Sequence, residues 1–420
     1  KYDFIDDLSF RASYGQSGGV PGKDYLYFNQ YAPFGYSYNG QSGVYPSNLE
    51  LTNLKWQTVT GTNLGLNFWI FNNRVLIDAE VYRNRTTDLI FDKLAIPSFT
   101  GLSIYSANSG TLDNQGWELN INTVPYRSKD ITVGFDFNIA RNANIIREVS
   151  EYFPRDNGVK LNENGVYRSY LLEGNPFGSF YGFKYKGVYS TAAETIAKDA
   201  DGNNIVGPNG QVVYMRFGYP SIDYQFEAGD ARYEDINHDG NIDEKDIVYL
   251  GNGIPKVTGG FGPNFKYKGL TVRAFFNYKL GVQVINAADM NTTNQYSYNN
   301  QSTAVLRRWR NPGDETDIPR ALFRRGYNWL GSDRYVEDGA FVRLRSVTLR
   351  YNLSNQILEK MKVRSASFYV TGENLATWTK YKGQDPDVTA RGNNDPFKVN
   401  VDNSLTPPTR NLLFGLTVGF

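Results

Sequence analysis

The sequence predicts an all-β fold, a transmembrane antiparallel β-barrel, and three observations indicate it. Apolar and polar residues alternate along about ten short segments, as in strands with one apolar and one polar face. Short turns and long loops alternate between these segments, which is typical of outer-membrane barrels. Aromatic residues make up 15% of the 420 residues and glycine contributes 41, a composition that suits strands and turns.

Ten strands are expected, and the clearest alternation runs from Ile131 to Ile139. Odd-numbered residues in that segment are apolar, whereas even-numbered ones are small or polar. The other strands are expected at 8–14, 64–70, 75–81, 117–121, 255–267, 270–276, 341–353, 363–374 and 411–420. Each has a length that a barrel strand needs to cross a bilayer or falls a few residues short of it.

The connections are of two kinds, and the kinds alternate along the chain. The short ones are Asn72-Asn73, 125–130, Lys268-Gly269 and 354–362. The long ones are 15–59, 97–110, 142–254, 281–339 and 375–409. We therefore expect short turns at a periplasmic rim and long loops outside. The alternative is a soluble all-β protein, in which long insertions fall at either end of the sheet.

Charge and composition exclude several classes of protein. The 44 basic and 43 acidic residues give a net charge of +1, so no global field attracts nucleic acid. The chain has no cysteine, which excludes disulfides, thiolate zinc sites and cysteine nucleophiles. Its single histidine, His238, argues against a Ser-His-Asp triad. No apolar run is long enough for a transmembrane helix, and the first residues lack the pattern of a signal peptide, so we expect a mature chain or a piece of a longer one.

A calcium site is predicted inside the long extracellular excursion 142–254. Residues 235–246, DINHDGNIDEKD, fit the loop D-x-[DN]-x-[DN]-G, which wraps oxygen donors round one hard cation. The expected ligands are the side chains of Asp235, Asn237, Asp239, Asp243 and Asp246 and the backbone carbonyl of Asn241. Position 12 is Asp246 instead of the glutamate of sensor loops, so a structural Ca²⁺ is expected. The alternative is an acidic turn that holds no ion.

Six segments, taken in order, carry a family resemblance. They are LSFRASYGQSG (8–18), LKWQTVTGTNLGLNF (54–68), VYRNRTTDLIFD (81–92), NSGTLDNQGWELNINT (108–123), DINHDGNIDEKD (235–246) and GENLATWTKYKGQDPD (372–387). With them the chain resembles the C-terminal barrel of SusC/RagA-type TonB-dependent transporters of Bacteroidetes over essentially all its length. The resemblance implies a 22-stranded barrel filled by an N-terminal plug. No plug and no TonB box are found, so we expect the C-terminal portion, about ten strands of a 22-stranded barrel.

The resemblance also implies a function, a location and partners. The function is energy-coupled import of a nutrient, an oligosaccharide or a peptide, by the barrel subunit of a SusCD-like complex in the cell outer membrane, which the chain crosses many times. The implied partners are a SusD-like surface lipoprotein, TonB acting through a plug domain, the N-terminal barrel and plug portion, and outer-membrane lipid. No nucleic acid partner is expected.

No enzymatic activity is expected, because nothing in the sequence brings two particular acids together. Two alternatives to import stay open: a passive porin, and a surface protein that binds or processes glycans. Candidate substrate contacts in the long loops are Trp309, Trp329, Trp378 and Tyr381, because aromatic faces stack on sugar rings. The alternative is that these four residues anchor loops or contact the lipoprotein.

Overall fold

The computed structural model describes residues 4–22, 24–95, 104–108, 110–149, 164–388, 400–404 and 406–420. Its main element is one antiparallel sheet of ten strands in the order β1-β4-β5-β8-β9-β17-β18-β21-β22-β24. Each strand of this sheet pairs with the next along the chain, which is the topology of an up-and-down barrel wall. β1 and β24 form the two edges.

The ten strands occur where the alternation predicts them. They are β1 (Ile5–Gly19), β4 (Gln57–Ile70), β5 (Val75–Thr87), β8 (Gly110–Arg127), β9 (Ile131–Val149), β17 (Val257–Tyr267), β18 (Leu270–Leu280), β21 (Phe341–Asn352), β22 (Ser365–Thr379) and β24 (Asn411–Gly419). β9 corrects one boundary, because residues 142–149, expected in the excursion 142–254, continue the strand and pair with β8. Strands that project beyond a membrane keep their ladder without needing an apolar face, so the alternation stops before the strand does.

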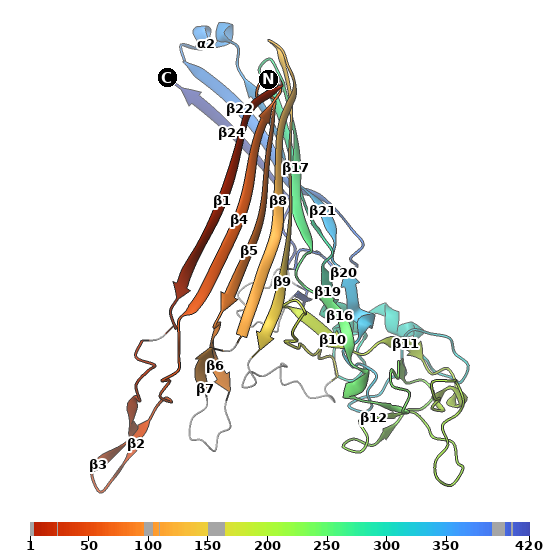
Figure 1. Cartoon of the computed structure of the whole chain (residues 1–420). Helices are drawn as coiled ribbons and strands as arrows, with labels where there is room; N and C mark the ends of the chain where they lie inside the picture. Colours follow the sequence, from red (N-terminus) through yellow and green to blue (C-terminus); the bar gives the residue numbers. More distant parts are fainter. Residues whose placement is uncertain are drawn as a thin grey trace.

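The short connections all lie at one end of the sheet. Phe71, Asn72 and Asn73 form one turn with φ of 59°, 57° and 57°, and helix α2 (Asn355–Met361) lies in another. Figure 1 shows both termini and α2 at this end and the larger loops at the opposite end, with β1, β4 and β5 in front and the fainter β22 and β24 behind. The predicted division between a short-turn end and a long-loop end is confirmed.

The register gives the sheet one apolar and one polar face. Across five neighbouring strands, one row consists of Phe68, Ile77, Ile121, Phe137 and Phe261. The next row lies one residue away on each strand and therefore on the opposite face. It consists of Asn67, Asp78, Asn120, Asn138 and Gly260. We call these the outer face and the inner face. A side chain changes face with every step along a strand, so the alternation of the sequence becomes two continuous surfaces.

Aromatic residues bracket the outer face of β8. Trp117 pairs with Val81, and Tyr126 pairs with Val133 beyond a bulge. At about 3.3 Å per residue and about 40° of strand tilt, these two rings lie roughly 23 Å apart along the barrel axis. Apolar bands of outer-membrane barrels are about 25 Å tall and lie between aromatic girdles. The outer face therefore has the height and the borders of a lipid-facing wall.

The long-loop end carries the remaining elements. The strands, by sheet, are β2 (Tyr31–Tyr38) with β3 (Gln41–Pro46), β6 (Ile90–Ala95) with β7 (Ile104–Asn108), β10 (Ser179–Gly182) with β16 (Val248–Asn252), β11 (Tyr185–Val188) with β14 (Ala231–Tyr233), β12 (Arg216–Phe217) with β13 (Tyr224–Gln225) and β15 (Asn241–Ile242), and β19 (Gln283–Asn286) with β20 (Val336–Asp338) and β23 (Val401–Asp402). The helices are α1 (Ala287–Thr293) and the 3₁₀ turns Ala192–Thr195, Glu244–Asp246, Thr303–Arg307 and Asp333–Tyr335. No helix in the described ranges is both long and apolar enough to cross a bilayer.

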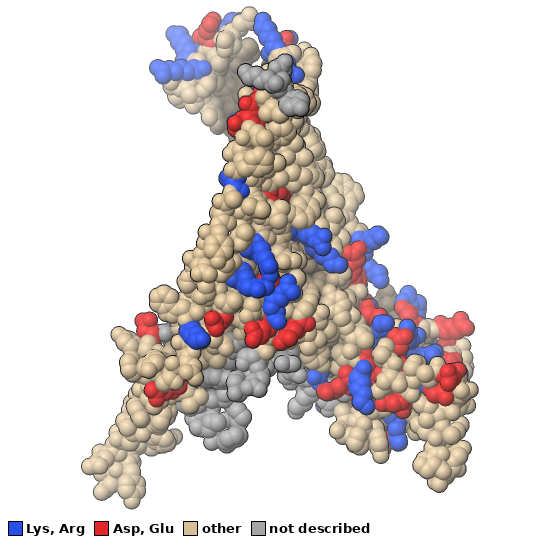
Figure 2. Space-filling model, viewed as in Figure 1, with Lys and Arg blue, Asp and Glu red and all other residues tan. Residues whose placement is uncertain are grey.

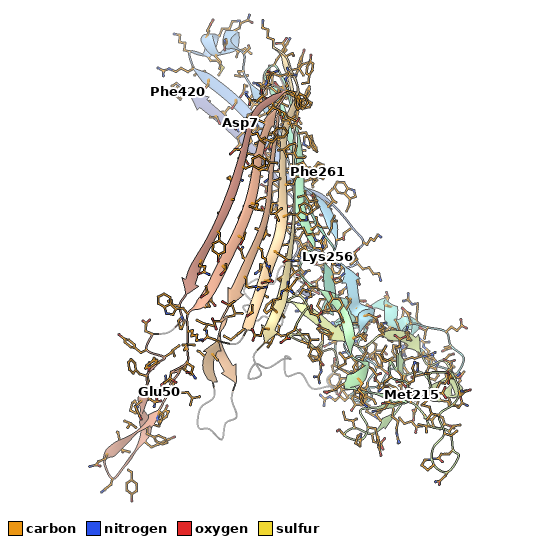
Figure 3. The ribbon with its side chains drawn as sticks, viewed as in Figure 1. Asp7, Glu50, Met215, Lys256, Phe261 and Phe420 are labelled. Atoms are coloured by element: carbon orange, nitrogen blue, oxygen red, sulfur yellow. The ribbon has the colours of Figure 1, made fainter. Side chains whose placement is uncertain are left out.

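Two buried clusters hold these loops together. The first consists of Phe183, Tyr189, Ala197, Met215, Phe217, Phe226, Ala231, Tyr233, Ile242 and Leu330. The second consists of Tyr167, Phe180, Ile285, Ala287, Met290, Ile318, Trp329 and Tyr335. Figure 3 places Met215 in this loop region and Phe420 at the short-turn end of the sheet. The long loops thus fold into a unit with its own core, which fixes the position of the candidate calcium loop.

Candidate functional site

The inner face of the sheet is hydrogen-bonded from strand to strand. Arg11 forms an ion pair with Asp78 at 3.2 Å, and Asn122 donates to Asp136 at 2.8 Å. Similar cross-strand bonds join Asn63 of β4 to Glu80 of β5 and Thr348 of β21 to Thr371 of β22. Carboxylate, amide and hydroxyl groups of this kind line the water-filled interior of outer-membrane barrels.

A buried arginine attaches the segment after β22 to the inner face. Arg343 of β21 is only 2% exposed and donates to both carboxylate oxygens of Asp385, at 2.6 and 2.7 Å. Its Nε donates to Thr377 at 3.0 Å, and Lys279 of β18 forms an ion pair with Asp387 at 2.6 Å. The aspartates of the QDPD sequence therefore position this segment over β18 and β21. The sequence contains the motif but gives no sign of these partners.

The predicted calcium loop lies at the edge of the first buried cluster. Ile242, in β15, is fully buried there. Gly240 has a φ of +81°, and a Cβ at this position would lie 2.9 Å from that of Ala197. Only glycine adopts this conformation at low cost. The sharp turn that the loop pattern requires is therefore present, and Ile242, two residues after it, packs into the first buried cluster.

Within the loop, the carboxylates accept hydrogen bonds from the loop's own backbone. Asp235 accepts from the N–H groups of Asp239 and Gly240 at 3.2 and 2.8 Å. Asp246, which is fully buried, accepts from Ile236 and Asp243 at 2.7 and 2.8 Å. These bonds hold Asp235 and Asp246 against the backbone of residues 235–246.

The remaining candidate ligands contact one another. Asn237 donates to Asp239 at 2.8 Å, and Asn241 donates to Asp243 at 3.2 Å. Burial raises the pKa of Asp235 and Asp246 above the ordinary aspartate value, which is the cost that a bound cation would offset. Among the described residues, no three acidic or histidine side chains are close enough together to hold an ion. The donor set suits calcium in type and order, and its ligation stays a prediction.

The four aromatic residues predicted as substrate contacts have packing roles. Trp329 is 1% exposed in the second cluster, and Tyr381, 6% exposed, donates to Asp402 at 2.6 Å. Trp309 donates through Nε1 to the carbonyl of Ser190 at 3.1 Å. Trp378 stacks on Phe276 of the outer face, with ring centroids 6.3 Å apart. Their contact with a substrate stays untested, and only Trp378 is strongly exposed, toward the lipid side.

The two-faced sheet and its loop unit can be compared with known proteins. A sequence profile described as TonB dependent receptor-like, beta-barrel matches residues 1–375. The chain belongs to the TonB-dependent receptor β-barrel family. Members of this family are outer-membrane β-barrel proteins, so the sheet is a multi-pass segment of the outer membrane. The predicted family, fold class and location are confirmed.

Its relatives are longer than the chain. TonB-dependent receptor P3 of Formosa agariphila is 28% identical over 426 residues, which cover 99% of this chain and 40% of that receptor. SusC of Bacteroides thetaiotaomicron is 26% identical over 447 residues, with 99% and 38% covered. The structure of the RagAB peptide transporter has a similar fold, with a TM-score of 0.74, 23% identity, and coverage of 100% of this chain and 42% of that one. This TonB-dependent receptor segment therefore spans about two fifths of the length of its relatives.

Proposed function

We propose that this chain forms part of the wall of an energy-coupled importer that takes up a nutrient, an oligosaccharide or a peptide. The observation that carries the proposal is the division of one sheet into an apolar outer face and a hydrogen-bonded polar inner face. Such a wall separates lipid from an aqueous path for a polar solute. Peptide is the substrate class of the RagAB transporter, whose fold is similar, and oligosaccharide is the class implied by the resemblance to SusC-type transporters.

The proposal requires further protein. Ten strands leave unpaired backbone groups on β1 and β24, and each such group costs several kcal/mol in lipid. We infer that an N-terminal barrel portion pairs with both edges and completes a barrel of 22 strands, the number implied by the resemblance. A plug domain would close the lumen and contact TonB, and a SusD-like lipoprotein would cover the long-loop end.

Uptake by cells tests this function. The full-length gene is deleted, and uptake of fluorescent oligosaccharides and of fluorescent peptides is compared between deletion and parent strains, each with and without TonB. Uptake of at least one probe should require both the gene and TonB. Gene-dependent uptake that continues without TonB would indicate the passive porin instead. Probes that come out chemically altered after incubation with the purified protein would indicate a processing enzyme.

We also propose that residues 235–246 bind a structural Ca²⁺. Support comes from the backbone-bonded carboxylates of Asp235 and Asp246, the burial of Asp246 and the turn at Gly240. A cation there would neutralise carboxylates that lie within one loop and stiffen the unit that surrounds the first buried cluster.

Thermal unfolding of the full-length protein tests the calcium proposal. Removal of Ca²⁺ by a chelator should lower the midpoint, and added Ca²⁺ but not Mg²⁺ should restore it, since calcium tolerates an irregular set of six to eight oxygens. Asp246→Asn should remove the response, whereas Asp201→Asn, an exposed aspartate of the same unit, should keep it. An unchanged midpoint after chelation would show that the loop is an acidic turn.

A further inference from the structure

Three arginines on the outer face bind one buried carboxylate. Asp113 of β8 is 0% exposed and accepts from Arg83 at 2.7 Å, from Arg85 at 2.7 and 3.0 Å and from Arg147 at 2.8 Å. The three arginine side chains nevertheless stay 49%, 43% and 40% exposed. Each keeps N–H donors beyond those bonded to Asp113. The carboxylate thus holds three guanidinium groups together, and their remaining N–H groups are exposed on the surface.

The cluster lies just beyond the aromatic border of the lipid-facing wall. Arg83 and Arg85 continue the outer-face series of β5 after Val81, which pairs with Trp117. Trp117 in turn pairs with Arg141 of β9. Two residues along a tilted strand rise about 5 Å along the barrel axis. Arg141 is therefore level with Trp117, whereas Arg83 lies about 5 Å and Arg85 about 10 Å beyond Trp117 toward the long loops. Headgroups begin at this level of a membrane.

A groove connects the basic cluster with the apolar wall. Its volume is about 500 Å³, and it crosses β4, β5, β8 and β9. Leu64, Val81 and Trp117 line its apolar part, and Arg83 and Arg141 line its basic part. Arg141 forms no ion pair within the described part of the chain. The groove therefore has hydrocarbon on its membrane side and guanidinium groups on its loop side.

The charges of this surface do not balance. Arg83, Arg85 and Arg147 share the single carboxylate of Asp113, and Glu148 is bonded to Thr111 at the end of β8. Three guanidinium groups on one carboxylate leave two positive charges within this cluster. Figure 2 shows basic side chains gathered on this side of the sheet, below a largely uncharged belt. Charged groups at the edge of hydrocarbon need a counter-ion.

We propose that this surface, the Arg83/Arg85/Arg141/Arg147 patch, binds the phosphate groups of an anionic lipid in the outer leaflet. Arginine forks match phosphate oxygens in pairs and keep their charge at every physiological pH. The groove receives an acyl chain or a sugar ring beside Leu64 and Trp117, while the phosphate meets Arg83 and Arg141. Asp113 is a positioning residue, because it fixes the direction of the guanidinium groups without contacting the lipid.

Lipid binding by the full-length protein tests the patch. The double variant Arg83→Gln/Arg141→Gln leaves Arg85 and Arg147 bound to Asp113, so the protein should still fold. Heat-modifiable migration on gels verifies that it does. Native mass spectrometry in detergent measures the affinity for lipid A. Each basic residue near an anionic lipid contributes about a five-fold factor, so the double variant should bind about 30-fold more weakly. Arg127→Gln, at the opposite end of β8, should bind like the parent protein.

Two comparisons separate charge and lipid from other causes. The double variant Arg83→Lys/Arg141→Lys should retain most of the affinity for lipid A. Lipid A without its phosphates should bind the parent protein no more tightly than intact lipid A binds the Arg83→Gln/Arg141→Gln variant. Inorganic phosphate at the same concentration should not displace lipid A. Equal binding of the dephosphorylated lipid, displacement by inorganic phosphate, or a second copy of the protein bound over the patch in place of lipid would each overturn the proposal.

Discussion

Ile121→Arg is the substitution that most severely tests the outer face. Ile121 lies four residues from Trp117 and five from Tyr126 along β8, so it is at the middle of the apolar band. Its neighbours in the row are Ile77 and Phe137. An arginine there lies between these two apolar side chains, and its guanidinium must extend along the wall toward a headgroup.

The expected cost follows from this depth. A guanidinium at the midplane of an outer-membrane barrel costs about 2–4 kcal/mol, and the cost falls to about 0–1 near the interfaces. Since each 1.4 kcal/mol is a factor of ten, the ratio of folded to unfolded protein should fall by roughly 30- to 700-fold. Asn120→Arg, one residue away on the inner face, should change the free energy of unfolding by no more than about 0.5 kcal/mol.

Reversible unfolding in lipid vesicles measures both variants. The full-length protein is folded into vesicles, titrated with guanidinium chloride and followed by tryptophan fluorescence, and the midpoints are compared at equal slope. A loss confined to Ile121→Arg supports the assigned faces. Equal losses for both variants, or a larger loss for Asn120→Arg, would refute the assignment.

Three further predictions concern the loop unit and its attachment. Ile242→Ala should destabilise that unit by about 2–5 kcal/mol through a cavity in the first cluster. Relative to the parent protein, hydrogen exchange should become faster in β12 and β15 but not in β8; equal changes in all three strands would contradict it. Arg320→Gln should cost about 3–5 kcal/mol, because it leaves the buried Asp230 without the cation 2.7 Å away, and an unchanged melting midpoint would count against this. Arg343→Gln should make the segment 380–388 sensitive to limited proteolysis, whereas Arg310→Gln, in an exposed loop, should not; protection in both variants would oppose the assigned role.

The membrane-spanning part of the fold could be predicted because one periodic constraint acts on every strand. Lipid on one side and water on the other force the alternation seen from Ile131 to Ile139, and each predicted strand is present. The alternation fails as a guide above the membrane. Residues 142–149 extend β9 through ladder hydrogen bonds, which leave no mark in the sequence.

The candidate site was harder to predict, because it depends on contacts between distant residues. The calcium loop is local, and its glycine and buried isoleucine lie as the spacing requires. The role of Trp329 is not local, since its burial arises from loops far apart in the chain. The arginine patch could not be predicted for the same reason, although one signal was present. Arg83 and Arg85 occupy odd-numbered positions, like the apolar residues from Val75 to Val81, and so fall on the same face of the strand.

Cysteine scanning along β9 tests the two-faced wall most directly, because residues 1–420 contain no cysteine of their own. Single cysteines at positions 131 to 139 of the full-length protein in vesicles are offered a water-soluble maleimide and, once labelled with a fluorophore, a quencher confined to acyl chains. We expect positions 132, 134, 136 and 138 to react readily with the maleimide, and positions 131, 133, 135, 137 and 139 to be quenched by the lipid probe. Uniform reactivity along the strand, or the opposite alternation, would contradict the assignment of the outer face to lipid.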